Sequence, residues 1–147
     1  MSPPRTRCHR DQAVAAELAG TLAARPLFCD LLTHAPLNLE RNVSLDTAYR
    51  FKLVAMAESR LIAADLASLL GLTKFQAIDV VATATGMAGA LWQTAAQGTQ
   101  LSTLYEKYPE LAYAKVEVKP RLAGILTDLL TGMRRTGPSG DADGDGV

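Results

Sequence analysis

Hydrophobic residues recur at intervals of three and four along most of the chain, which is the period of an α-helix rather than of a β-strand. The first such series predicts a helix over residues 11–24. One face of it carries Val14, Leu18 and Leu22. Asp11 is a preferred N-cap residue at its start. Pro26 ends it, because the residue before a proline avoids the helical region.

Two further helices are predicted before the middle of the chain. One spans residues 26–41, and Pro36 inside it should kink or end it because proline lacks a backbone N–H. The other spans residues 44–70, where Ser44 is a suitable N-cap and Gly71 suits a left-handed C-cap.

The apolar stripe of the 44–70 helix contains one carboxylate. The stripe consists of Phe51, Val54, Ala55, Leu61, Ile62, Leu66 and Leu69. Glu58 falls inside it, where a carboxylate costs free energy unless it is paired. Glu58 therefore either contacts a cationic or hydroxylated ligand, or pairs with an arginine or lies at the helix edge, which is the commoner arrangement.

The C-terminal half contains a helix with very small side chains, predicted over residues 73–96. Its small residues include Ala82, Ala84, Gly86, Ala88, Gly89 and Ala90. Two glycines inside a helix cost about 1 kcal/mol each relative to alanine, so close backbone approach to a neighbour is expected. Residues 100–107 predict a short helix or turn. The last long element, 109–133, should break near residues 116–118 because of Pro120.

These elements predict an all-α fold, a helical bundle of about five helices, over residues 11–134. Abundant Ala and Leu and an aromatic fraction of 5% favour helix over sheet. Residues 1–10 predict a flexible lead and residues 135–147 a disordered acidic tail. Residues 141–146 match the start of an EF-hand loop, but the later ligands are missing and a solvated terminus is expected.

The charges and the reactive residues exclude several classes of protein. Fifteen basic and fifteen acidic residues cancel, so the chain lacks the basic footprint of a nucleic-acid-binding domain. No secretory signal or membrane span is recognisable, and a cytoplasmic protein is expected. The two cysteines and two histidines do not cluster, so neither a metal site nor a cofactor is expected. The sequence contains no catalytic motif, which favours a protein that is not an enzyme.

Six segments resemble the ligand-binding half of TetR/AcrR-type transcriptional regulators. They are RPLFCDLL (25–32), LERNVS (39–44), FK (51–52), GALWQ (89–93), PELA (109–112) and PRL (120–122). The resemblance covers roughly residues 11–133. It implies an all-helical domain that binds a small-molecule effector, while DNA is bound by an N-terminal helix-turn-helix domain. No such motif precedes Asp11, so contact with DNA is expected only through a domain missing from this chain.

The resemblance also implies a homodimer in which the last two long helices of each copy form a four-helix bundle. The expected interface residues are Ala82, Gly86, Gly89, Leu122, Ile125 and Leu129. Packing of the small-residue face within one monomer is an equally weighted alternative.

No ligand-binding residue carries over by motif. From the pattern alone the candidates are Glu58, His34, Met56, Met87 and Trp92, and core packing is the alternative for the last four. An alternative function is a stand-alone helical interaction protein that heterodimerises with an intact regulator. A small-ligand carrier is a third possibility.

Overall fold

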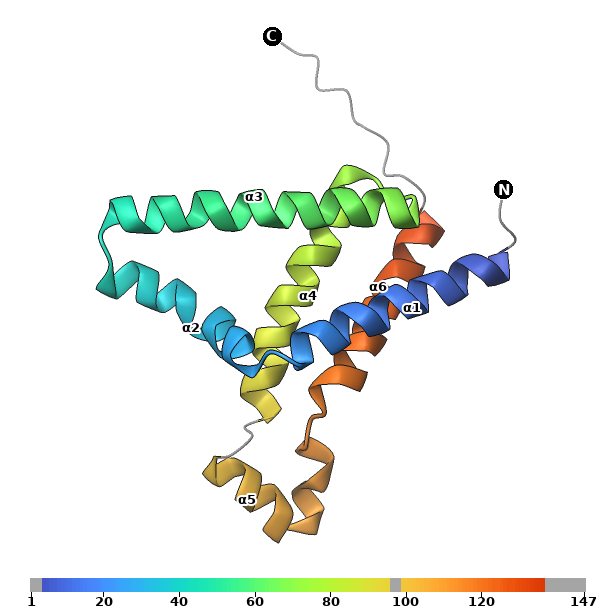
Figure 1. The fold of residues 1–147 in the computed structure, drawn as a ribbon. Helices are drawn as coiled ribbons and strands as arrows, with labels where there is room; N and C mark the ends of the chain where they lie inside the picture. The colour runs from blue at the N-terminus through green and yellow to red at the C-terminus, as the bar shows by residue number, and fades with distance from the viewer. Residues whose placement is uncertain (1–3, 96–98, 137–147) are drawn as a thin grey trace.

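The computed structural model describes residues 4–95 and 99–136, and these form helices and their connections without a β-strand. The all-α prediction is therefore confirmed. The elements are α1 (Pro4–Ala23), α2 (Pro26–Asn42), α3 (Leu45–Leu70), α4 (Lys74–Ala95), α5 (Gln100–Lys107), the 3₁₀-helix η1 (Pro109–Ala114) and α6 (Val118–Thr136). In Figure 1, α2, α3 and α4 outline a triangle, α1 and α6 lie side by side next to α4, and α5 with η1 forms the lower end.

Local capping chemistry determines where α3 and α4 begin. Ser44 Oγ accepts a hydrogen bond of 3.2 Å from the Thr47 N–H, and Gly71 ends α3 at φ 66° and ψ 40°. Both caps were predicted. Thr73 and Gln76 form a reciprocal capping box at the start of α4, with bonds of 3.0 and 3.2 Å.

Helix α1 begins earlier than the sequence predicts, at Pro4 instead of after Asp11. Residues 4–10, expected in a flexible lead, are helical, whereas residues 1–3 lie outside the described part. Asp11 is not an N-cap: it lies inside α1 and is 3% exposed. The prediction was wrong because the carboxylate has a distant partner, described below, that local sequence does not reveal. Of the expected tail, residues 135 and 136 end α6 and residues 137–147 lie outside the described part.

The two internal prolines have different effects. Helix α2 continues through Pro36 to Asn42. Pro36 therefore does not end α2, although it lacks the N–H that an interior helical residue donates. Pro120 lies in the first turn of α6, where a free N–H has no intrahelical partner. The break predicted at residues 116–118 is found at residues 115–117, between η1 and α6.

The hydrophobic core has two parts that meet along α6. The larger part joins α1, α2, α4 and α6. Its buried members are Ala15, Ala19, Leu22, Cys29, Ala84, Ala88, Leu91, Ala95, Val118, Leu122 and Leu126. Burial raises the pKa of the Cys29 thiol, which donates to the Leu22 carbonyl at 3.3 Å. The smaller part joins the end of α3 to α4 and α6 through Ala63, Leu66, Leu70, Ala77, Val80, Val81 and Leu130.

Helix α3 is packed only near its C-terminal end. Its buried residues are Ala63, Leu66 and Leu70, and its residues 45–62 include none that is buried. Most of the predicted apolar stripe is therefore not buried within this chain. Its exposed members are Phe51, Val54, Leu61, Ile62 and Leu69. Figure 1 shows the reason: α4 meets α3 near the end of α3, and the rest of α3 extends beyond it.

The close backbone approach expected for α4 occurs where α2 crosses it at Gly89. A Cβ atom at Gly89 would lie 3.3 Å from Leu32 Cβ and 3.3 Å from Thr33 Oγ1. The Thr33 hydroxyl also donates to the Gly89 carbonyl at 3.1 Å. The small residue at this position therefore allows α2 and α4 to pack together.

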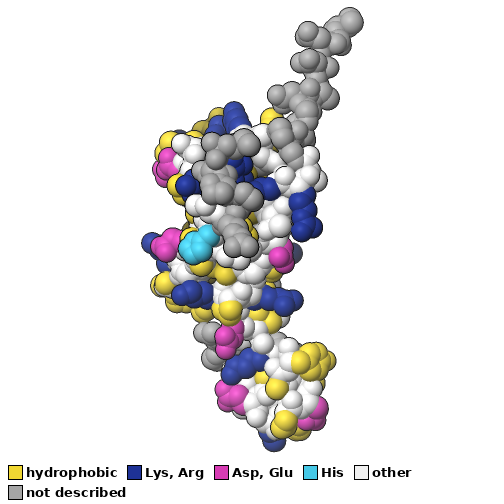
Figure 2. Space-filling view, turned by 90° about the vertical axis from the view of Figure 1, so that its right-hand side faces the viewer, with side chains coloured by type: hydrophobic (Ala, Val, Ile, Leu, Met, Phe, Trp, Pro, Cys, Tyr) yellow, Lys and Arg dark blue, Asp and Glu magenta, His cyan; other side chains and the backbone are white. Residues whose placement is uncertain are grey.

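Side chains of both charge signs lie on the surface. On the face shown in Figure 2, acidic and basic side chains both lie among hydrophobic ones, and several Lys and Arg side chains lie near its upper end. This distribution agrees with the formal net charge of zero.

Replacing Gly89 by alanine should lower the free energy of unfolding by about 1–3 kcal/mol, because the added methyl pushes α2 away from α4. Gly132 is the control: nothing lies within 4 Å of a Cβ atom there. Gly132→Ala should raise stability by up to about 1 kcal/mol through helix propensity. Urea unfolding monitored by circular dichroism measures both. Equal stabilisation by the two substitutions would contradict the tight crossing.

Candidate functional site

A hollow of ≈ 420 Å³ opens between α3 and α4. Its walls are mostly apolar and consist of Lys52, Ala55, Met56, Ser59, Arg60, Ile78, Val81, Ala82 and Thr85. A volume of this size lies within the range of small-molecule sites, which are commonly apolar with a few polar groups. We call this hollow the α3/α4 pocket.

The pocket forms because small side chains line the two helices where they diverge. The face of α3 that is buried at Ala63 continues toward the N-terminus as Ser59 and Ala55. On α4 the facing positions include Ala82 and Thr85. These side chains are too short to fill the space between the two helices, so an open hollow remains there.

The polar groups of the pocket are basic or hydroxyl groups. Thr85 Oγ1 donates to the Val81 carbonyl at 2.9 Å, within its own helix. Lys52 and Arg60 are exposed, and neither forms an ion pair with another described residue. No acidic side chain is part of the described lining. The pocket therefore combines an apolar wall with unpaired positive charge.

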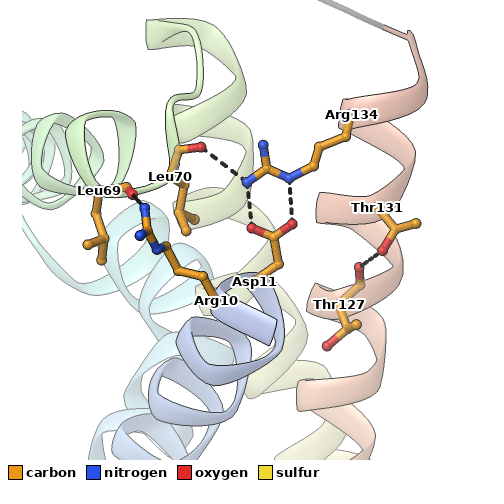
Figure 3. A network of polar contacts seen from close by, with 7 residues as sticks. All are labelled: Arg10, Asp11, Leu69, Leu70, Thr127, Thr131 and Arg134. Carbon is orange, nitrogen blue, oxygen red and sulfur yellow. Dashed lines mark hydrogen bonds and ion pairs between the residues drawn. The ribbon is translucent and has the colours of Figure 1, made fainter. Parts of the chain in front are cut away.

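A group of polar contacts holds the C-terminal end of α3 (Figure 3). Arg134 of α6 donates two hydrogen bonds to the Asp11 carboxylate of α1, and a third, of 3.1 Å, to the Leu70 carbonyl. Arg10 of α1 donates to the Leu69 carbonyl at 3.4 Å. Helix ends leave such carbonyls without intrahelical partners. We call these contacts the α3 clamp.

Burial makes the central ion pair of the clamp important for stability. The side chains of Asp11 and Arg134 are 4% and 28% exposed. The hydrogen bonds with Asp11 raise the pKa of the Arg134 guanidinium, so Arg134 stays charged. The clamp joins α1 and α6 to the C-terminal end of α3. The part of α3 that lines the pocket lies nearer its N-terminus.

Residues 4–137 match the family described as Tetracyclin repressor-like, C-terminal domain. The chain belongs to this family. The match confirms the resemblance noted in the sequence, and it begins at the residue where α1 begins. Domains of this kind generally dimerise and bind small-molecule effectors. A comparison with curated proteins gives no match.

The predicted ligand-binding residues are spread over the TetR-like domain. Met56 lines the α3/α4 pocket. His34 and Trp92 share a second hollow of ≈ 360 Å³ between α2 and α4. Met87 is partly buried and packs against the larger core. Glu58 is exposed and does not line the pocket, because its side chain lies on a part of α3 that faces solvent.

The predicted interface residues fall into two groups. Gly89 packs against α2, and Leu122 is 0% exposed, so these two have no surface to offer a second copy. Their inclusion is corrected: both serve the core of one chain. The remaining four are accessible. Ala82 and Gly86 are exposed, and Ile125 and Leu129 are half-buried.

Sequence reasoning did not select the polar residues of either feature. The sequence does contain a pattern that could have indicated the pocket. At helical spacing one face carries Lys52, Met56, Ser59 and Arg60, and this face lies next to the predicted apolar stripe. For the clamp no local signal exists, because Asp11 and Arg134 are separated by 123 positions.

Within the described ranges, other kinds of site find no support. Three or more metal-ligating side chains do not gather at any point of residues 4–95 or 99–136. No helix in the same ranges is long and apolar enough to cross a membrane.

Replacing Arg134 by methionine should lower the free energy of unfolding by about 3–5 kcal/mol, since it leaves the buried Asp11 carboxylate unpaired. Arg135 is the control, because it is exposed on the same turn. Arg135→Met should change stability by no more than about 0.5 kcal/mol. Chemical denaturation measures both values.

A double variant separates the ion pair from side-chain packing. Asp11→Leu combined with Arg134→Met removes both charges and should be more stable than Arg134→Met alone. If Arg134→Met unfolds at the same denaturant concentration as Arg135→Met, the clamp does not stabilise the domain.

Proposed function

We propose that this TetR-like domain senses a small-molecule effector in the α3/α4 pocket and dimerises through α4 and α6. The observation that carries the proposal is the position of the pocket. It lies between α3, which is anchored at one end, and α4, whose outer face carries small exposed residues. A ligand in the pocket would therefore contact both a movable helix and a helix of the dimer interface.

The α3 clamp supports a role in transmitting the effector signal. An effector shifts an equilibrium only if it binds two conformations with different affinities. A ligand wedged between α3 and α4 favours one angle between these helices. A change of this angle acts on the Leu69 and Leu70 carbonyls, which Arg10 and Arg134 bind. The movement then reaches α1, which carries Arg10 and Asp11.

The outer faces of α4 and α6 support dimerisation. Gly86 on α4 is exposed, and nothing lies within 4 Å of a Cβ atom added there; Ala82 is also exposed, but it borders the α3/α4 pocket. Ile125 and Leu129 on α6 keep part of their apolar surface accessible. Because α4 and α6 pack against each other, two copies can align the pairs as a symmetric four-helix bundle.

The proposed role is regulatory rather than catalytic, and it places the domain in the cytoplasm. In this role the domain contributes the effector site and the dimer contact. Operator DNA is bound by a separate helix-turn-helix unit, as in regulators of the TetR type. The net charge of zero fits a domain that does not itself contact phosphate groups.

Replacing Gly86 by leucine should weaken the homodimer at least tenfold, or by about 1.4 kcal/mol. The larger side chain holds apart two helices that would otherwise pack closely. Sedimentation equilibrium over a range of concentrations measures the dissociation constant, and circular dichroism verifies that the helices persist.

Ala64→Leu is the matched control, because Ala64 is an exposed alanine on α3 outside the proposed interface. This variant should dimerise like the unaltered protein. A Gly86→Leu protein that dimerises with undiminished affinity would show that this face of α4 is not the interface.

A further inference from the structure

The α3/α4 pocket has a charge pattern that restricts the ligands it can bind. Lys52 and Arg60 both line it, and they are separated by eight positions of α3. At 1.5 Å per residue their Cα atoms lie about 12 Å apart along the helix axis. The two cations therefore occupy opposite ends of the α3 wall, with Ala55, Met56 and Ser59 between them.

Both cations are available for a ligand. The ion pairs among the described residues join Asp30 with His34, Asp46 with Arg50 and Asp11 with Arg134, and they include neither Lys52 nor Arg60. Arg50 provides a contrast within the same helix: it lies 3.1 Å from Asp46 and does not line the pocket.

The rest of the wall suits an apolar body. Ala55 and Met56 on α3 face Ile78, Val81 and Ala82 on α4. Lysine and arginine cover apolar surface with their stems and keep their charged heads at the water boundary. A ligand that satisfies this arrangement places its apolar part between the helices and its negative charge at the rim.

We propose that the effector is an amphipathic organic anion, whose apolar chain lies along α3 and whose acidic group pairs with Lys52 or Arg60. The inference rests on the proposed sensing function and specifies the chemical class of its effector. A cationic amphiphile is disfavoured, because it would meet two positive charges and no lining carboxylate. A neutral amphiphile would fill the apolar part without using either cation.

Dodecanoate, added below its micellar concentration, is the probe for this inference. The chain has four methionines, of which Met56 lines the pocket and Met87 packs against the core. In protein labelled with ¹³C at the methionine methyl groups, dodecanoate should shift the Met56 resonance and leave that of Met87 unchanged. The Met56→Leu variant assigns the signal.

Charge variants test the role of the two cations. Lys52→Gln combined with Arg60→Gln should weaken dodecanoate binding about tenfold or more, because a hydrogen bond to a charged group is lost. Arg50→Gln is the control on the same helix and should bind as the unaltered protein does. Dodecanol and dodecyltrimethylammonium, which have the same chain length, should bind more weakly than dodecanoate.

Three results would overturn the inference. The first is that dodecanoate does not bind, and the second is that its binding shifts Met87 instead of Met56. The third is that dodecanol or the ammonium compound binds as tightly as dodecanoate. The first two results refute this effector class at this pocket, and the third refutes the role of charge. Dodecanol separates this inference from the sensing proposal: a Met56 shift with dodecanol but not with dodecanoate would leave the pocket standing as an effector site and refute only the anionic class.

Discussion

The ion pair between Asp11 and Arg134 is the contact on which the arrangement of the helices depends. It joins α1 to α6, and the same guanidinium binds the Leu70 carbonyl at the end of α3. A buried carboxylate is tolerated only with such a partner. Because the pair is 123 positions apart in the chain, it forms only when α6 has docked on α1. Gly71 sets where α3 ends in the sequence, and this tertiary contact fixes where that end lies in the fold.

Anchoring α3 at one end explains both the pocket and the exposed apolar surface. Near the clamp, Leu66 and Leu70 fill the seam between α3 and α4. Farther away, Ala55 and Ser59 are too small to fill it, and the pocket opens. The domain thus keeps apolar surface uncovered on α3 at a cost in stability. A sensor has a use for this arrangement, because ligand binding then stabilises one position of α3.

The sequence predicted the features that depend on neighbours in the chain. Ser44, Gly71 and the break before α6 follow from local chemistry, and all are confirmed. Residues whose role depends on distant partners were misjudged. Asp11 is a residue type that is common at N-caps, but in the fold it pairs with Arg134. Glu58 was selected because periodicity identifies an apolar face without showing whether another helix covers it. Met56 lines the α3/α4 pocket because it lies on a side of α3 that faces α4, and its role in ligand binding stays a prediction.

Hydrogen exchange along α3 tests most directly the claim that this helix is anchored at only one end. The amides of residues 63–70, next to the clamp, should exchange through rare openings of the domain. Those of residues 49–58 should exchange at least about a hundredfold faster, because few buried contacts oppose local opening there. This gradient, measured by mass spectrometry or NMR without ligand, would support the account. Equal protection along the whole of α3 would contradict it.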